Sequence, residues 1–324
     1  MLLNYPIVAE IAYHTYAVNE YGMASFFVLR GKERGLVIDS GCGSFDARAL
    51  IEKLCPVPYD VVMTHGHGDH IGAACQWEKA WLHPLDFDRV KDVHRMKEML
   101  WENPAIHVKP GSRGFGVKAP SGEVWDYPYT KYAAIDIYDL HEDMFLGFEN
   151  MPQWLPLEDG QKFDLGDGRV CEIIHTPGHT AGSCSVLDPD TRILFSGDAC
   201  NINLGISGTS VNTALRGLLK LDARRGDFDR NFNSHVGAGG DPCCFSMPDS
   251  TLDDCIWICR AIMDGTAEII ENAPPKGVKP GAIPPWMLHN GKPPKGASVI
   301  HGAVRINFNL NRLLDEGEVP ICQG

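Results

Sequence analysis

Residues 64–70 read Thr-His-Gly-His-Gly-Asp-His, which places four potential metal ligands directly after the apolar run 59–63. Buried together, imidazole and carboxylate groups need hydrogen bonds or a cation to offset their desolvation. The two glycines let the loop coil tightly, so that His65 and His67 can face one ion while Asp69 and His70 face another. The stretch therefore predicts a loop at the end of a buried strand that binds two metal ions.

Three further candidate ligands occur later in the chain, each just after a β-rich run. His179 follows the run 169–175, where a Pro-Gly pair forces a sharp turn. Asp198 follows the run 192–195, and His235 is followed by glycine-rich sequence. Each residue alone is a weak signal, but together with the first loop they predict one seven-ligand site.

The remaining pattern divides the chain into two similar halves. Predicted strands lie at 24–30, 35–39 and 59–63 in the first half, and at 161–165, 169–175, 184–187 and 192–195 in the second. Helices are predicted over 45–54, 71–80 and 86–102, the last from apolar residues spaced three and four apart. Both halves run from hairpin to strand, ligand loop and helix. Two packed sheets covered by helices are the expected arrangement.

The ordered strings THGHGDH, HTPGHT and SGD, followed by a late His with Gly behind it, resemble the motif set of the metallo-β-lactamase superfamily, closest to its glyoxalase II-like branch. The resemblance covers roughly residues 24–83 and 157–240. It implies an α/β fold, the αββα metallo-β-lactamase sandwich, with a dinuclear site between the sheets. We expect one domain over 1–324, with an aromatic-rich insertion at 104–156 and a C-terminal extension at 275–324.

The resemblance also implies a role for each ligand. His65, His67 and His179 would hold the first metal, Asp69, His70 and His235 would hold the second, and Asp198 would bridge them. Asp39 matches the family's early Asp motif, which would orient ligands from behind. The alternative for Asp39 is a turn residue that caps the following helix.

Two divalent cations close together lower the pKa of a shared water, so that a bridging hydroxide attacks the substrate and Asp69 passes a proton to the leaving group. Nitrogen and oxygen ligands favour Zn²⁺, with Mn²⁺ or Fe²⁺ as alternatives. Family members with a di-iron redox centre carry Glu where His67 stands here, which favours hydrolysis. The zinc β-lactamases carry Cys where Asp198 stands, which argues against that activity.

The substrate is less well defined by the sequence. An ester, lactone or thioester is the leading prediction, although Asn201 stands where the family's lactonases have Tyr. The alternatives are a phosphodiesterase of the same fold and a metal-retaining ligand-binding protein. With 42 acidic and 29 basic residues the net charge is −13, which disfavours nucleic acid and anionic membranes as partners and leaves a small-molecule substrate.

The segment 104–156 combines Gly and Pro with many aromatic residues, so it is too apolar for a disordered linker. It is predicted to form either a lid over the site or an interface between copies in a homo-oligomer. The first sixteen residues lack the basic start of a secretory signal, and the eleven cysteines show no regular spacing. A reducing, cytoplasmic location is therefore expected.

Overall fold

The computed structural model describes residues 6–20, 24–91, 117–118, 124–125, 151–235, 246–271 and 294–321. Its first layer is a seven-stranded sheet, antiparallel from β1 to β4 and parallel from β4 to β9. In spatial order the strands are β1 (Ile7–Ala12), β2 (Thr15–Glu20), β3 (Ala24–Arg30), β4 (Gly35–Ile38), β5 (Tyr59–Val62), β6 (Lys79–Leu82) and β9 (Gln153–Pro156). The predicted hairpin of β3 and β4 is confirmed, with Phe27 opposite Ile38.

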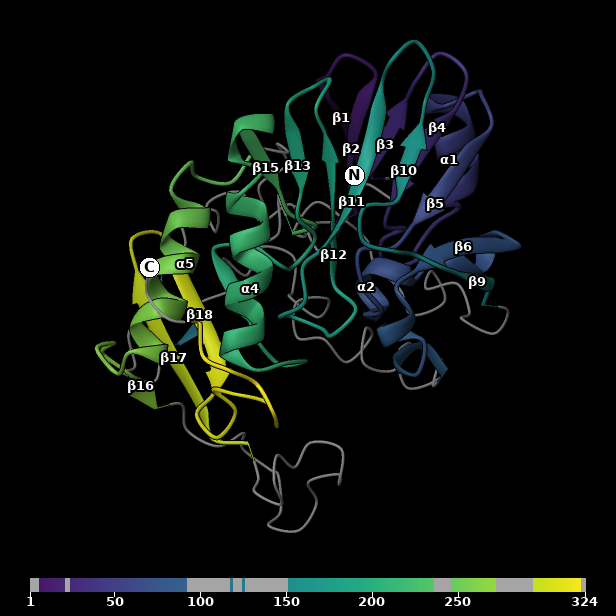
Figure 1. Ribbon diagram of the computed structural model, residues 1–324. Helices are drawn as coiled ribbons and strands as arrows, with labels where there is room; N and C mark the ends of the chain where they lie inside the picture. The colour runs from purple at the N-terminus through teal and green to yellow at the C-terminus, as the bar shows by residue number, and fades with distance from the viewer. Residues whose placement is uncertain are drawn as a thin grey trace.

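A five-stranded sheet forms the second layer. In spatial order its strands are β10 (Lys162–Asp164), β11 (Val170–His175), β12 (Cys184–Asp188), β13 (Ile193–Phe195) and β15 (Arg230–Phe232). β12 is antiparallel to both β11 and β13, and β13 is parallel to β15. β11, β13 and β15 therefore point the same way, and the loops that follow them leave one edge of the sheet (Figure 1).

The two sheets pack face to face around a common apolar core. Phe27 and Ile38 from the first sheet meet Ile173 and Phe195 from the second, and the rings of Phe27 and Phe195 have centroids 4.7 Å apart. Because side chains alternate between the faces of a strand, the opposite faces need a cover of their own.

Helices supply that cover on both sides of the sandwich. On the first sheet α1 (Ala47–Leu54) packs over β3, β4 and β5, and its first turn is capped by Asp46. On the second sheet α4 (Val211–Asp222) and α5 (Thr251–Met263) pack against each other and over Leu187 and Leu194. The order of layers is helix, sheet, sheet, helix, so the predicted αββα fold is confirmed.

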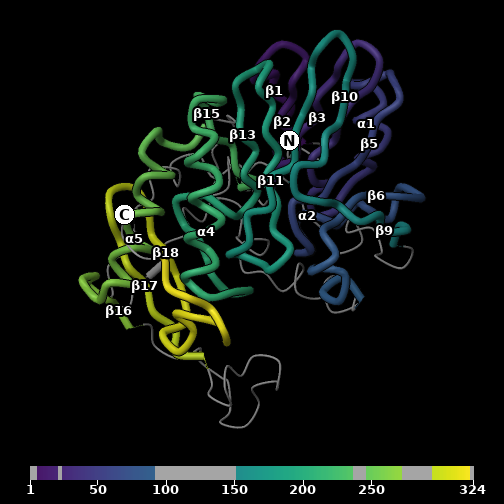
Figure 2. The backbone as a smooth tube through the Cα atoms, in the orientation of Figure 1, coloured from purple at the N-terminus to yellow at the C-terminus, as the bar shows by residue number. Residues whose placement is uncertain are grey.

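A third, smaller sheet lies next to α4 and α5. It consists of β14 (Asn203–Gly205), β18 (Val304–Asn309), β17 (Gly296–His301) and β16 (Ile270–Glu271) in spatial order. The backbone trace shows the yellow C-terminal strands beside these two helices (Figure 2). Val299 and Ile306 join the same apolar cluster as α4 and α5. Two further short strands, β7 (Val117–Lys118) and β8 (Val124–Trp125), pair only with each other among the described residues.

The helix predicted over 71–80 is wrong. The helical turn α2 (Gly68–Ile71) ends at Gly72, and a short 3₁₀ turn at Ala74–Gln76 leads into β6. A Cβ on Gly72 would lie 2.1 Å from the backbone carbon of Cys42, so this point is a close crossing of two chains. β6 then pairs with both β5 and β9, and that pairing outweighs the local helical pattern.

The helix predicted over 86–102 is also wrong over residues 86–91, the part of this range that the structure describes. Residues up to Lys91 form two 3₁₀ turns, Pro84–Asp86 and Arg89–Lys91, and the rest of the range lies outside the described residues. Most of the predicted insertion at 104–156 lies outside them as well. Within the part of the chain that the structure describes, no helix has the length and apolar character needed to cross a membrane.

Candidate metal centre

The seven predicted ligands converge at one edge of the sandwich. The loop after β5 carries four of them, and the loops after β11, β13 and β15 each carry one. They fall into overlapping groups whose ligand atoms all lie within 4.8 Å of one another: His65 with His67 and His179, His65 with His70 and Asp198, and Asp69 with His70 and His235. Their roles as ligands remain a prediction, which this geometry supports.

Three ring nitrogens face each other in the group of His65, His67 and His179, called here the three-histidine group. His67 Nδ1 lies 3.0 Å from His65 Nε2 and 2.9 Å from His179 Nε2. The other nitrogens of two rings are engaged behind the group: His65 Nδ1 lies 3.1 Å from Thr64 Oγ1, and His179 Nδ1 lies 2.8 Å from the carbonyl of Gly205. Such outer contacts fix the orientation of each imidazole.

The second group, called here the mixed group, consists of Asp69, His70 and His235. Asp69 Oδ2 lies 3.4 Å from His235 Nε2 and 3.7 Å from His70 Nε2. Asp198 stands between the two groups, since its Oδ2 lies 3.2 Å from His235 Nε2 and 3.5 Å from His179 Nε2. A carboxylate in this position can contact ions held by both groups.

Two buried polar atoms of the site have no hydrogen-bond partner among the described residues: His70 Nε2 and Asp198 Oδ1. Both residues are at most 7% exposed, so leaving these atoms unpaired costs free energy. An unpaired imidazole nitrogen and an unpaired carboxylate oxygen are both electron-pair donors. A divalent cation satisfies both, so the residues present fit a metal ion.

Electrostatics separate the two groups. Burial, followed by the neighbouring His179, lowers the pKa of His67 to about 3, and burial with His70 nearby lowers the pKa of His65 well below its usual range. In the mixed group, burial opposes the charged form of His70, but Asp69 and Asp39 outweigh it and raise the pKa of His70 to about 9. The three-histidine group thus offers neutral lone pairs, and the carboxylates around His70 attract positive charge.

Asp39 lies directly behind the mixed group and is fully buried. Its carboxylate accepts hydrogen bonds from the backbone N–H and hydroxyl of Thr64 at 2.6 and 2.9 Å and from Ser234 Oγ at 2.7 Å. His70 Nδ1 lies 2.9 Å from the same carboxylate. These contacts support the predicted orienting role, and the residue that caps the following helix is Asp46.

Two neighbours of the site were missed by the sequence reasoning, Asp86 and Arg89. Asp86 accepts hydrogen bonds from the ligand loop after β5 and from the ligand loop after β11. Arg89 NH1 lies 3.1 Å from His67 Nε2 at the partly exposed rim of the site. They belong to the segment predicted as a plain amphipathic helix, where a lone Asp and Arg give no signal of a site.

The two histidines omitted from the predicted ligand set lie beside the site. His83 and His175 stack on each other with ring centroids 4.0 Å apart, and His175 Nε2 lies 2.9 Å from the carbonyl of Ala181. Neither is part of the three ligand groups. Cys200 is buried in the core under α4 and α5 and belongs to none of the three ligand groups.

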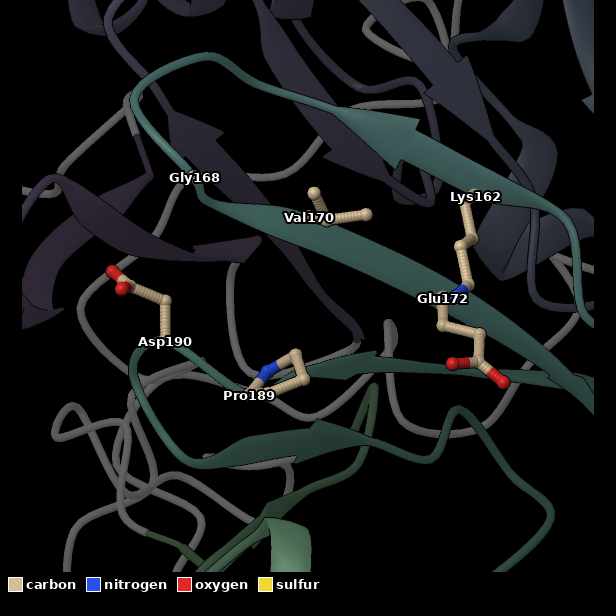
Figure 3. A pocket seen from close by; sticks show the side chains of 6 residues that line it. All are labelled: Lys162, Gly168, Val170, Glu172, Pro189 and Asp190. Carbon is tan, nitrogen blue, oxygen red and sulfur yellow. The ribbon is translucent and has the colours of Figure 1, made fainter.

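A surface pocket lies elsewhere, on strands β10 and β11 and the turn that follows β12 (Figure 3). Lys162 and Glu172 line it together with Asp190, near the turns at the opposite end of β11 from His179. None of the predicted ligands lines this pocket, so it is separate from the candidate metal centre.

Comparison of the sequence with protein families identifies the same family as the fold and the ligand pattern do. The Metallo-beta-lactamase superfamily matches residues 20–221, which is more than half of the chain. The chain therefore belongs to the metallo-beta-lactamase superfamily, and the predicted family is confirmed.

Relatives with curated names include the acyl-coenzyme A thioesterase MBLAC2 of Homo sapiens, 26% identical over 187 residues that cover 54% of this chain and 57% of the relative. The Bos taurus protein of that name matches with the same identity and coverage. A hydroxyacylglutathione hydrolase of Brucella anthropi is 40% identical over 74 residues, 22% of this chain and 28% of that protein. The chain thus spans little more than half the length of the thioesterases it matches.

Solved structures that resemble this chain share its fold at low sequence identity, so they show similarity of fold alone. A double mutant of the sec-alkyl sulfatase PisA1 gives a TM-score of 0.53 at 16% identity, covering 80% of this chain and 42% of that one. VMB-1 gives a TM-score of 0.50 at 15% identity, covering 80% of this chain and 98% of that one.

Proposed function

We propose that the chain is a metal-dependent hydrolase that cleaves acyl thioesters of the acyl-coenzyme A type. The observation that carries the hydrolase proposal is the convergence of seven nitrogen and oxygen ligands at one edge of the sandwich. The choice of a thioester among the ester classes is supported by the human and bovine relatives, which are named acyl-coenzyme A thioesterases.

Two divalent cations, with Zn²⁺ as the expected ion, fit the donor set of the site. His65, His67 and His179 would hold one, Asp69, His70 and His235 the other, and Asp198 would contact both. When bound, such ions supply Lewis acidity and make a water-derived nucleophile available at neutral pH. Metal identity and number are parts of this proposal.

The chain's own groups have distinct tasks in the reaction. His65, His70 and Asp198 form the closed floor of the site, whereas His67, Asp69, His179 and His235 are partly exposed and face the side where a substrate enters. Asp69 is the carboxylate of the mixed group with exposed surface, 29% of its side chain. It is placed to accept a proton and return it to the departing thiolate, a role within reach of a positioned carboxylate.

The test is hydrolysis of a substrate panel by purified protein of known metal content. Acyl-coenzyme A thioesters are followed by release of free thiol, beside aryl esters, lactones and bis-nitrophenyl phosphate. We expect kcat/KM to be highest on a thioester and activity to vanish on chelation and return with Zn²⁺. His67→Ala and Asp198→Asn should each lower kcat by at least about 100-fold while the fold, measured by circular dichroism, is kept.

Each contrary outcome contradicts a specific part of the proposal. Full rates in both variants would overturn the metal-dependent mechanism. A higher kcat/KM on the phosphodiester than on any thioester would show that the protein is a phosphodiesterase and not a thioesterase. Bound metal without turnover of any substrate would leave a binding protein.

A further inference from the structure

The carboxylate of Asp86 lies between two loops that carry ligands. Asp86 ends the 3₁₀ turn after β6 and is 1% exposed. Its Oδ2 accepts a hydrogen bond from the N–H of Gly66 at 2.9 Å and one from Thr180 Oγ1 at 2.7 Å. Its Oδ1 accepts a third from the N–H of Gly182 at 3.0 Å. All three donors belong to the two loops, and none belongs to the turn that contains Asp86.

The donors of these hydrogen bonds lie next to the candidate ligands in the sequence. Gly66 stands between His65 and His67, and Thr180 follows His179 directly. One side chain is therefore bonded to a residue next to every member of the three-histidine group. Asp86 does not approach the reacting centre itself, so it acts through the ligands.

The glycines next to Asp86 support a built arrangement. A Cβ on Gly182 would lie 2.7 Å from Asp86 Cγ, a distance that Cβ atoms do not tolerate. A Cβ on Gly66 would lie 3.0 Å from Val90 Cγ1 and 3.4 Å from Asp86 Cβ. The absence of a side chain at Gly182 lets the carboxylate reach that backbone, and its absence at Gly66 leaves room for Val90 beside the same carboxylate.

We propose that Asp86 is a positioning residue that ties the two loops of the three-histidine group together and sets the affinity of that group for its metal ion. The inference rests on the proposed metal site but not on the proposed substrate. A carboxylate suits the task because it only accepts hydrogen bonds, and the three groups that bond to it are all donors. The guanidinium of Arg89, whose Nε lies 4.0 Å from Oδ1, adds a positive charge beside it. Contacts of this kind behind a ligand set change metal affinity by about 10- to 100-fold.

The decisive variant is Asp86→Asn, which keeps the size of the side chain. Its amide group turns one acceptor into a donor, so at least one of the three donors loses its partner. We expect the three-histidine group to bind Zn²⁺ about 10- to 100-fold more weakly, with the mixed group unchanged. The measurement is a competitive titration of metal-free protein with Zn²⁺ and a chromophoric chelator, with the Co²⁺ absorption spectrum as a second readout of ligand geometry.

Thr180→Val is a milder version of the same change, because it removes one donor and leaves the carboxylate intact. It should weaken the same site by a smaller factor. Asp188→Asn is the control, since Asp188 is a buried carboxylate that pairs with Arg169 at the other end of β11. It should lower thermal stability without changing either metal affinity.

The proposal is overturned if Asp86→Asn binds two Zn²⁺ ions as tightly as the parent protein. It is also overturned if Asp188→Asn, at an equal loss of thermal stability, weakens the three-histidine group as much as Asp86→Asn does. Failure of the proposed function is a different result. In that case metal titrations of the parent and the Asn variant still differ, while no thioester is cleaved by either protein.

Discussion

Asp39 has a backbone φ of 65°, a left-handed conformation that residues other than glycine seldom adopt. This conformation coincides with a carboxylate that contacts Thr64, Ser234 and His70 at once. Such conformations persist where surrounding contacts hold them in place. The backbone at Asp39 is thus part of how the mixed group is oriented.

Asp39→Asn should therefore weaken metal binding at the mixed group by about 10- to 100-fold. Its amide would point a donor at Thr64 or at the cluster around His70, which we expect to lower stability by about 1–3 kcal/mol. Zn²⁺ titration and urea unfolding measure the two effects. Asp60→Asn is the matched control, because Asp60 pairs with Arg34 on the surface. An equal effect of both variants would contradict an orienting role for Asp39.

Arg89 gives a prediction about the substrate. If His67 directs Nδ1 toward the three-histidine group, its Nε2 carries hydrogen, and this donor lies 3.1 Å from the donor Arg89 NH1. Two facing donors require an acceptor, and an anionic part of the substrate meets that need. Arg89→Ala should raise KM for acyl-coenzyme A about 10- to 100-fold, in line with a lost hydrogen bond between charged groups.

The comparison substrate for Arg89→Ala is an uncharged acyl thioester with the same acyl group. Its KM should change by less than about twofold, and Arg48→Ala, a surface change on α1, should alter neither value. An equal loss on the charged and uncharged thioesters would show that Arg89 does not recognise charge.

At this scale the sequence marks the candidate ligands, which the structure brings together, more clearly than the residues that support them. His65, His67, Asp69 and His70 are adjacent in the chain, and a dense run of metal-binding groups has few structural explanations. Asp86 and Arg89 reach the site only through folding. Single acidic and basic residues are common on surfaces, so nothing in their local sequence marks them.

Among the elements, α4 bears most directly on the site because it packs against the turn that precedes His179. A Cβ on Gly217 of α4 would lie 2.8 Å from the carbonyl oxygen of Pro177 and 3.1 Å from the carbonyl carbon of Thr176. The loop and the helix therefore meet backbone to backbone.

Gly217→Ala should destabilise the protein although alanine favours helix by about 1 kcal/mol over glycine. Overpacking against a fixed backbone costs about 1–3 kcal/mol, so we expect a net loss of up to about 2 kcal/mol by urea unfolding. Gly226→Ala is the control, since nothing lies within 4 Å of the added Cβ. A stability gain in both variants would contradict the close contact of α4 with the loop.

The start of α4 is tied to the C-terminal segment through Glu318. Its carboxylate accepts hydrogen bonds from Ser210 Oγ at 2.5 Å, from the N–H of Asp315 at 2.6 Å and from the hydroxyl of Thr213. Burial raises the pKa of Glu318, but these hydrogen bonds outweigh it and hold the pKa below the usual 4.5. The ionised form is therefore the one that stabilises the fold.

A pKa lowered by folding contributes stability above the unfolded value, and that contribution disappears as the pH falls through the folded value. Glu318→Gln should cost about 1.5–3 kcal/mol at pH 7, and the difference should shrink as the pH drops below about 4.5. Thermal unfolding across this range measures it. Glu316→Gln is the control, because Glu316 is an exposed residue of the same segment, and it should change the free energy of unfolding at pH 7 by less than about 0.5 kcal/mol. A constant difference across pH would rule out the ionised carboxylate as the source.

The elements also show where local pattern is insufficient. The strands β3, β4, β5 and β11 follow their apolar runs closely, because the apolar pattern of each reports its buried positions, which are nearly all of β3 and β4 and about half of β5 and β11. The end of the helix predicted over 71–80 is instead the start of strand β6 (Lys79–Leu82), since its pairing with β9 comes from a segment some seventy residues away. A long-range partner of this kind leaves no trace in the local sequence.

On the scale of the whole molecule, the two-layer plan could be predicted because each half repeats hairpin, strand, ligand loop and helix. The N-terminal hairpin of β1 and β2 was not predicted, and neither was the pairing of β14 with β18 across about one hundred residues. The single-domain organisation, the insertion at 104–156 and the cytoplasmic location stay predictions.

The two sheets are joined at the end of the sandwich opposite the candidate metal centre by Arg169, a buried arginine of the second sheet that is ion-paired within its own sheet. Arg169, just before β11, lies 2.6 Å from Asp188 Oδ2, and the same guanidinium donates to Thr15 Oγ1 at 2.7 Å and to the carbonyl of Arg30 at 3.2 Å. Arg169 is 6% exposed and Asp188 is fully buried. One side chain of the second sheet thus bonds two strands of the first.

Arg169→Met should lower the free energy of unfolding by about 3–5 kcal/mol, because it leaves the buried charge of Asp188 without its cationic partner and with only the hydroxyl of Thr191 bonded to it. The double variant Arg169→Met/Asp188→Leu removes both charges and should recover much of that loss, as apolar replacements of buried ion pairs often do. Urea unfolding compares the three proteins, and Zn²⁺ titration should give parent affinities in each while it is folded. If the double variant is no more stable than the single one, the bonds to Thr15 and Arg30 hold the sheets together. Weaker metal binding in either variant would show that this end of the sandwich also sets the geometry of the metal centre.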